Sequence, residues 1–366
     1  MITTTIFPSR YVQGPNALEL LGEELARLGK KVLLLQDPFA AQNLKQQIEA
    51  GLAGKLETHT EVFEGECCDE EIERLSAIAG IDVVAGIGGG KALDTAKAVA
   101  HNLGVPVAII PTLASTDAPC SALSVVYTKE GEFARYLILP QNPNLVLVDS
   151  TVVANAPTRF LVAGMGDALA TWFEADSCGR TKAGNMTGRL GSATAQGLAR
   201  MCFEVLIEYG SLAKDACDAN VTSPALERVI EANTLLSGLG FESAGLAAAH
   251  AIHNGLTVLE ATHAYWHGEK VAFGVLSSLI LTDKDPETVD LVYDFCESIG
   301  LPTTLAEIGL GNATDADLMK VAEAATAAGE TIHNEAGTVT PAAVFQAIKA
   351  ADAVGQARKS CGCCHG

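Results

Sequence analysis

Four short apolar runs in the first part of the chain, separated by segments with helical periodicity, limit the folds that this sequence can adopt. The runs are KKVLLLQDP, IDVVAGIGGG, VPVAIIP and NPNLVLVD, and helical patterns between them end at Gly29 and Gly80. Such runs are typical of strands buried on both faces, and their alternation with helices predicts parallel pairing through right-handed crossovers. SALSVVYT and RYLILP, which flank KEGE, predict an additional β-hairpin. We therefore expect an α/β N-terminal domain with a mostly parallel, Rossmann-like sheet.

The second half of the chain has a different pattern. After about Pro157 the strand signals stop, and alanine- and leucine-rich segments such as ATAQGLARMCFEVLIEYG continue with helical spacing through Ala353. This predicts an all-α C-terminal domain. The chain is long enough for about two domains, and we expect them to cover residues 1–157 and 158–366.

Composition excludes several classes of protein. A formal net charge of -20 would repel the phosphate backbone of a nucleic acid. No apolar run is long enough to span a bilayer, and the first residues, MITTTIFPSR, lack the pattern of a secretory signal. Most of the ten cysteines stand alone in apolar or helical segments, which favours a reducing compartment. We expect a cytoplasmic protein that binds neither nucleic acid nor membrane, and we assign no catalytic role to the terminal CGCCHG.

A glycine-rich loop, GIGGGKALDTAKA, follows the second apolar run and opens a helix. Backbone N–H groups and the helix dipole can hold a phosphate there, which makes Gly88, Gly89, Gly90 and Lys91 candidate cofactor contacts. The loop is not a Walker A motif, because Ala92 follows the lysine, and it lacks the third glycine of the usual dinucleotide fingerprint. The alternative is a tight turn that caps an ordinary helix.

Two acidic positions accompany this loop. Asp37 ends an earlier strand, where its carboxylate could accept hydrogen bonds from a ribose or adenine. Asp117 lies in PTLASTDAPCSALSVVYT, a segment rich in hydroxyl side chains that follows the strand VPVAII. This segment is expected at the carboxyl end of the sheet, where ligands bind in open α/β folds, although such hydroxyls often only satisfy turn backbones.

Four of the eight histidines cluster in AHAIHNGLTVLEATHAYWHGEKVAFG. His250 and His253 are spaced i, i+3, and His263 and His267 are spaced i, i+4, so on helices each pair would share a face. Two such pairs indicate a metal site or a proton-handling site.

These motifs, with GMGDALATWFEA, resemble the glycerol dehydrogenases of the iron-containing alcohol dehydrogenase superfamily, which have the dehydroquinate synthase-like fold. The resemblance covers roughly residues 5 to 355. It implies a homo-octamer, a substrate contact at Asp117 and one metal per subunit bound by Asp167, His250 and His267, so that these four residues form the catalytic set. The NAD contacts that it implies are Asp37, Gly90, Lys91, Thr112, Ser115, Ser121, Leu123 and Tyr127.

The activity that the resemblance implies is the reversible, NAD-dependent oxidation of glycerol to dihydroxyacetone, with other vicinal diols such as 1,2-propanediol as further substrates. Hydride would pass to nicotinamide C4 from an alkoxide that the metal stabilises. A carboxylate and two imidazoles suit Zn²⁺. Many iron-dependent relatives have a histidine four residues after the aspartate, and Thr171 at this position favours zinc over iron.

Several alternatives stay open. We expect His253 and His263 to be supporting or surface histidines, His333 to lie at a helix end, and Glu174 and Asp176 to lie on the flank of the Asp167 helix. A dehydroquinate synthase-like lyase would use the same fold, NAD and zinc, but would need several basic residues for a carboxylate-phosphate substrate. A non-catalytic metal or nucleotide sensor would bind NAD without turnover.

Overall fold

The computed structural model describes residues 2–52, 54 and 56–362, so Cys363, Cys364 and His365 of the terminal cluster lie outside the described residues. Contacts within the chain divide it into two compact units. The sheet unit comprises Ile6–Leu161 and Asp215–Gly238, and the helical unit comprises Met1–Thr5, Val162–Lys214 and Leu239–Gly366. The assignment of residues 1–157 to an NAD-binding domain and of 158–366 to a metal-binding domain stays a prediction.

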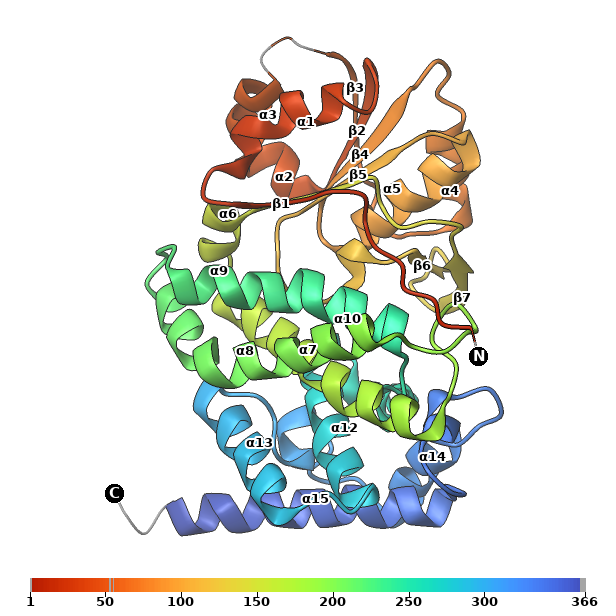
Figure 1. Cartoon of the computed structure of the whole chain (residues 1–366), viewed down its shortest axis with the longest axis vertical. Coiled ribbons are helices and arrows are strands. Elements are labelled where there is room, and N and C mark those ends of the chain that lie inside the picture. Colours follow the sequence, from red (N-terminus) through yellow and green to blue (C-terminus); the bar gives the residue numbers. More distant parts are fainter. Residues whose placement is uncertain (1, 53, 55, 363–366) are drawn as a thin grey trace. The chain divides into compact units, whose positions relative to one another are not determined.

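The sheet unit contains a six-stranded parallel sheet with the order β1-β8-β5-β4-β2-β3, which confirms the predicted fold class (Figure 1). Its strands are β1 (Tyr11–Gly14), β2 (Lys31–Gln36), β3 (Glu57–Val62), β4 (Val83–Gly88), β5 (Val107–Pro111) and β8 (Leu145–Asp149). The predicted hairpin is also present, as the antiparallel pair β6 (Leu123–Tyr127) and β7 (Phe133–Ile138).

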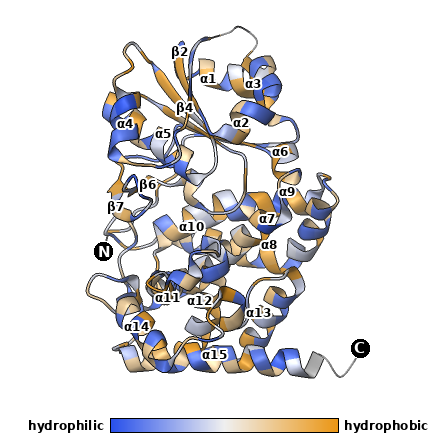
Figure 2. Cartoon of the chain, turned by 180° about the vertical axis from the view of Figure 1, so that it is seen from behind, coloured by the Kyte–Doolittle hydropathy of each residue, from blue (hydrophilic) through white to orange (hydrophobic). Residues whose placement is uncertain are grey.

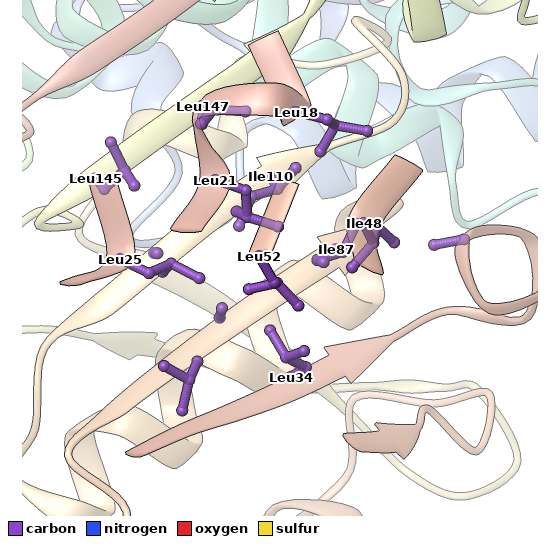
Figure 3. Packing of buried hydrophobic residues seen from close by; sticks show 14 of the residues in the cluster. Leu18, Leu21, Leu25, Leu34, Ile48, Leu52, Ile87, Ile110, Leu145 and Leu147 are labelled. Carbon is purple, nitrogen blue, oxygen red and sulfur yellow. The ribbon is translucent and has the colours of Figure 1, made fainter. Parts of the chain in front are cut away.

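Helices cover both faces of this sheet. Figure 1 shows α1 (Leu21–Ala26) and α3 (Lys45–Leu52) on the opposite side from α4 (Asp69–Ser76) and α5 (Gly90–Leu103). Strands β2 and β4 are almost entirely buried and largely apolar (Figure 2). Leucines of the first helices pack on them and on β5 and β8 (Figure 3). Burial of each such side chain contributes about 1.5–3 kcal/mol.

The strand order reverses between β2 and β4. From β2 the chain adds β3 on one side, and it then returns to add β4, β5 and β8 on the other side. In open α/β sheets, ligands bind at the carboxyl ends of the strands where the order reverses. Asp37 follows β2 and the glycine loop follows β4, so the topology brings these two predicted cofactor elements to this point.

The structure differs from the sequence predictions at the sheet edges and at two helices. Strands β1 and β3 were not predicted, because each pairs with one neighbour only and β3 (ETHTEV) is polar and mostly exposed. The helix expected to end at Gly80 is α4, which ends at Ser76. The first helical pattern begins with a 3₁₀ turn, η1 (Ala17–Leu20), before α1.

The part of the chain that follows β8 is helix-rich, as predicted. The further helices are α2 (Pro38–Asn43), α6 (Ser150–Ala154), α7 (Thr158–Thr181), α8 (Ala193–Asp218), α9 (Pro224–Glu231), α10 (Ser237–Ala244), α11 (Ala248–Leu256), α12 (His267–Leu281), α13 (Pro286–Ile299), α14 (Asp315–Ala325) and α15 (Pro341–Gly362). The short ones are η2 (Ala118–Cys120), the π-helical η3 (Ala232–Leu236), η4 (Glu260–Thr262), η5 (Leu305–Ile308) and η6 (Thr331–Asn334). No single helix of the described residues is long and apolar enough to cross a bilayer, and one bent pair, Pro224–Ala244 with Ala248–Leu256, meets this test only when joined.

Candidate functional site

Three potential metal ligands from three helices of the helical unit lie together. Asp167 is on α7, His250 is on α11, and His267 is the first residue of α12. The Nε2 atoms of His267 and His250 lie 3.0 and 3.4 Å from Asp167 Oδ1. One donor atom from each residue lies within 4.8 Å of the others, and the aspartate is fully buried. The donor set, one carboxylate and two imidazoles, therefore fits a divalent transition metal.

Glycines beside these ligands let the three helices approach closely. A Cβ at Gly268, next to His267, would lie 1.7 Å from the carbonyl oxygen of Ala163 on α7. A Cβ at Gly274 of α12 would lie 2.4 Å from the carbonyl oxygen of Ala249, next to His250. Only hydrogen fits at these positions, so the glycines set the spacing of the ligand-bearing backbones.

Glu174 holds His250 in place. Its Oε1 accepts hydrogen bonds of 2.9 Å from the backbone N–H groups of Ala247 and His250, and its Oε2 lies 2.6 Å from His250 Nδ1. When Nδ1–H donates a hydrogen bond to this carboxylate and Nε2 carries no proton, the lone pair of Nε2 points toward Asp167 and can bind a metal.

Sequence reasoning missed this role, because it placed Glu174 on the flank of α7. The structure buries Glu174, whereas Asp176 forms ion pairs with Arg180 and Lys284. The signal that could have found Glu174 is its spacing. It follows Asp167 by seven residues, which is two helical turns and therefore the same face of α7.

The charges of the cluster depend on one another. Burial raises the pKa of Asp167, but the charges of His267 and His250 outweigh this effect and hold the pKa below its ordinary value. Burial lowers the pKa of His250, but the carboxylates of Glu174 and Asp167 outweigh burial and raise it. The carboxylates thus favour positive charge at this place, and a metal cation would supply that charge.

The two other histidines of the cluster occupy different surroundings. His253 is buried on α11, and its ring lies edge-on to that of His267 with the centroids 4.2 Å apart. Burial and the neighbouring histidines lower the pKa of His253, which keeps its ring neutral. His263 is exposed, and its Nε2 lies 2.9 Å from the carbonyl oxygen of Thr257. His263 and His267 do not share a helix, because η4 ends at Thr262 and α12 begins at His267.

Thr171 follows Asp167 by one helical turn and is fully buried. A Cβ at Gly240 would lie 2.3 Å from Thr171 Cγ2, so α7 and α10 pack tightly at this position. His333, expected at a helix end, lies in the last turn of η6.

The glycine loop lies at the carboxyl end of β4 in the sheet unit. Gly88 has a φ of +149°, and a Cβ there would lie 2.5 Å from the carboxylate of Asp37. The two oxygens of this carboxylate accept hydrogen bonds from Gly89 N (2.9 Å) and from Ala40 N at the start of α2 (2.7 Å). Asp37 therefore connects the carboxyl ends of β2 and β4.

Two other predicted cofactor contacts, Thr112 and Tyr127, lie close to the loop. Thr112 N donates to Gly88 O at 3.1 Å, and Lys91 Nζ lies 5.1 Å from the ring centroid of Tyr127 and forms an ion pair with Glu66. Ser115 lies between β5 and η2, Ser121 directly follows η2, and Leu123 is the first residue of β6. The structure thus places Thr112 and Tyr127 beside the glycine loop, at the end of the sheet where ligands bind in this class of fold.

Asp117, the predicted substrate contact, precedes η2 in the sheet unit and is buried. Its Oδ2 accepts a hydrogen bond of 2.8 Å from Ser237 Oγ. A Cβ at Gly238 would lie 2.9 Å from the Asp117 carbonyl oxygen, so the backbone around Asp117 packs against the start of α10.

Comparison with known proteins gives a consistent result. A family model described as "Iron-containing alcohol dehydrogenase" matches residues 8–150. The chain is 63% identical over 362 residues to a glycerol dehydrogenase of Thermotoga maritima, covering 98% of this chain and 100% of that one. It is 46% identical over 359 residues to a glycolaldehyde reductase of Halobacterium salinarum, covering 96% and 98%. A crystal structure of glycerol dehydrogenase from Schizosaccharomyces pombe superposes with a TM-score of 0.94 at 38% identity, covering 99% of this chain and 93% of that one.

Proposed function

The chain belongs to the iron-containing alcohol dehydrogenase family and is an oxidoreductase, and we propose that it catalyses the reversible, NAD-dependent oxidation of glycerol to dihydroxyacetone. The observation that carries this proposal is the cluster of Asp167, His250 and His267, in a chain that is 63% identical to a glycerol dehydrogenase. The cytoplasmic location and the homo-octamer remain part of the proposal.

The proposed metal is zinc, held by Asp167, His250 and His267. Three protein ligands are typical of catalytic zinc sites, and Thr171 stands where many iron-dependent relatives have a further histidine. A metal bound there would act as a Lewis acid that lowers the pKa of a substrate hydroxyl.

The residues of the chain supply binding and orientation. Glu174 keeps the proton of His250 on Nδ1, which leaves Nε2 as the ligand atom. In the sheet unit, the N–H groups at the start of α5 would hold the cofactor phosphates, with Lys91 beside them. The carboxylate of Asp117 would accept a hydrogen bond from a substrate hydroxyl and so orient it.

We expect vicinal diols to be oxidised faster than alcohols with one hydroxyl, because two adjacent oxygens can bind one metal ion together and a single oxygen cannot. The test is a panel of glycerol, 1,2-propanediol, 1,3-propanediol and ethanol with NAD, followed by the absorbance of the reduced nicotinamide. Glycolaldehyde with reduced NAD belongs in the panel because of the Halobacterium salinarum relative. Turnover of ethanol as fast as glycerol, or no turnover of any diol, would contradict the proposed substrate class.

NAD is expected to be preferred to NADP, because the Asp37 carboxylate would repel a 2′-phosphate on the adenine ribose. At an effective dielectric constant of about 20, two charges about 6 Å apart interact by about 3 kcal/mol, which makes a preference of about 100-fold in kcat/KM. Asp37→Asn should narrow this preference, since it removes the charge.

Asp37→Ala is a less direct test, because it also removes the hydrogen bonds to Gly89 and Ala40. The matched control is Asp82→Asn, which neutralises a carboxylate that likewise accepts two backbone hydrogen bonds, from Lys30 N and Lys31 N, and should leave the ratio of NAD to NADP activity unchanged. An unchanged ratio of NAD to NADP activity in Asp37→Asn would show that this carboxylate does not discriminate between the two cofactors.

A further inference from the structure

Lys97 is a buried lysine of α5 that the proposed reaction does not use. Its side chain has no exposed surface. Its Nζ donates to the carbonyl oxygens of Ala118 at 2.7 Å and Leu123 at 2.9 Å, and lies 3.3 Å from Ser121 Oγ. A buried ammonium group is costly unless it is hydrogen-bonded and paired, so these contacts hold the segment around Ser121 firmly.

Asp94, one turn earlier on α5, completes the arrangement. Its Oδ1 lies 3.2 Å from Lys97 Nζ, and its Oδ2 accepts a hydrogen bond of 3.0 Å from Val125 N. The carbonyl oxygen of Asp94 accepts a further bond of 2.9 Å from Ser124 Oγ. The two charged residues therefore bind the backbone of the segment 118–125 at both ends.

This segment, together with Asp117 directly before it, carries residues on which the proposed reaction depends. Asp117 immediately precedes η2, and Ser121 and Leu123 follow it. The glycine loop begins the same helix that carries Lys97. Helix α5 thus carries both the N-terminus that is proposed to bind the cofactor phosphates and the lysine that binds the segment 118–125.

We propose that Lys97, paired with Asp94, is a positioning residue that orders the segment 117–125 and thereby places Asp117 for the substrate and Ser121 and Leu123 for the cofactor. This inference rests on the proposed function, because it takes these three residues as ligand contacts. Because its side chain has no exposed surface, Lys97 itself would touch neither substrate nor cofactor.

The test uses Lys97→Met in the full-length, metal-loaded protein. Without the ammonium group, the carbonyl oxygens of Ala118 and Leu123 lose the hydrogen bonds that come from α5, and Ala118 O keeps its bonds from Ser121 N and Oγ within the segment. We expect amide hydrogen exchange in 117–125 to accelerate by about tenfold or more. The KM values for NAD and glycerol should each rise by about tenfold, with unchanged metal content. The double variant Asp94→Asn/Lys97→Met removes both buried charges and serves if the single variant does not fold.

The matched control is Lys284→Met, which removes a lysine that pairs with Asp176 in the helical unit. It should leave exchange in 117–125 and both KM values unchanged. Equal exchange of this segment in wild type and in the folded Lys97 variants would overturn the inference, and so would accelerated exchange with unchanged KM values. If the wild-type protein does not oxidise glycerol, the proposed function fails, while hydrogen exchange and NAD affinity measured by calorimetry still decide the role of Lys97.

Discussion

His267→Ala is expected to release the metal and to lower kcat/KM for glycerol by about 10³-fold or more, because a Lewis acid contributes several kcal/mol to charge stabilisation and each 1.36 kcal/mol is tenfold in rate. The remaining pair, Asp167 and His250, offers two ligand atoms, which bind a metal weakly. NAD affinity should be retained, since the predicted NAD contacts belong to the sheet unit. Metal content by mass spectrometry, NAD affinity by calorimetry and steady-state kinetics test the three parts separately.

The control for this prediction is His263→Ala. His263 is exposed and bonds to the backbone of Thr257, so its loss should change neither metal content nor kcat/KM. His253 is unsuitable as a control because its buried ring contacts His267. Full metal occupancy in His267→Ala, or metal loss in His263→Ala, would show that the wrong histidine of this pair is assigned as the ligand.

The sheet could be predicted where strands are buried on both faces. Strands β2, β4, β5 and β8 are continuous apolar runs, and burial on both faces produces that composition. β3 could not be predicted, because an exposed edge strand has no buried face to impose a pattern on its sequence. The reversal of strand order between β2 and β4 is a pairing between distant segments, which local periodicity does not encode.

The candidate site was also predictable only in part. Histidine spacing drew attention to His250 and His267, and the structure brings both to Asp167. The spacing could not show that Gly268 and Gly274 contact other backbones, because a helical glycine has the same local sequence pattern whatever it packs against. The burial of Lys97 could not be predicted either, because only the structure distinguishes this buried lysine from a solvent-exposed lysine of an amphipathic helix.

Glu174→Gln is expected to weaken metal affinity by about 10–100-fold, the usual effect of removing a partner that orients a metal-binding histidine. The carboxylate accepts three hydrogen bonds, two at Oε1 from backbone N–H groups and one at Oε2 from His250 Nδ1. Glutamine has a single acceptor oxygen, and if that oxygen keeps the two backbone bonds, its NH₂ group faces Nδ1. The proton of His250 then moves to Nε2, which removes the lone pair that would bind the metal.

The measurement for Glu174→Gln is the metal dissociation constant, determined by competition with a chelator on protein whose fold is checked by circular dichroism. Glu174→Asp is the informative companion, because it keeps the charge but shortens the side chain, and its affinity should lie between those of wild type and Glu174→Gln. Asp176→Asn is the matched control on the same helix, since Asp176 pairs with Arg180 and Lys284 rather than with a histidine. If Glu174→Gln and Asp176→Asn both bind metal like the wild type, the hydrogen bond to Nδ1 does not set the ligand form of His250.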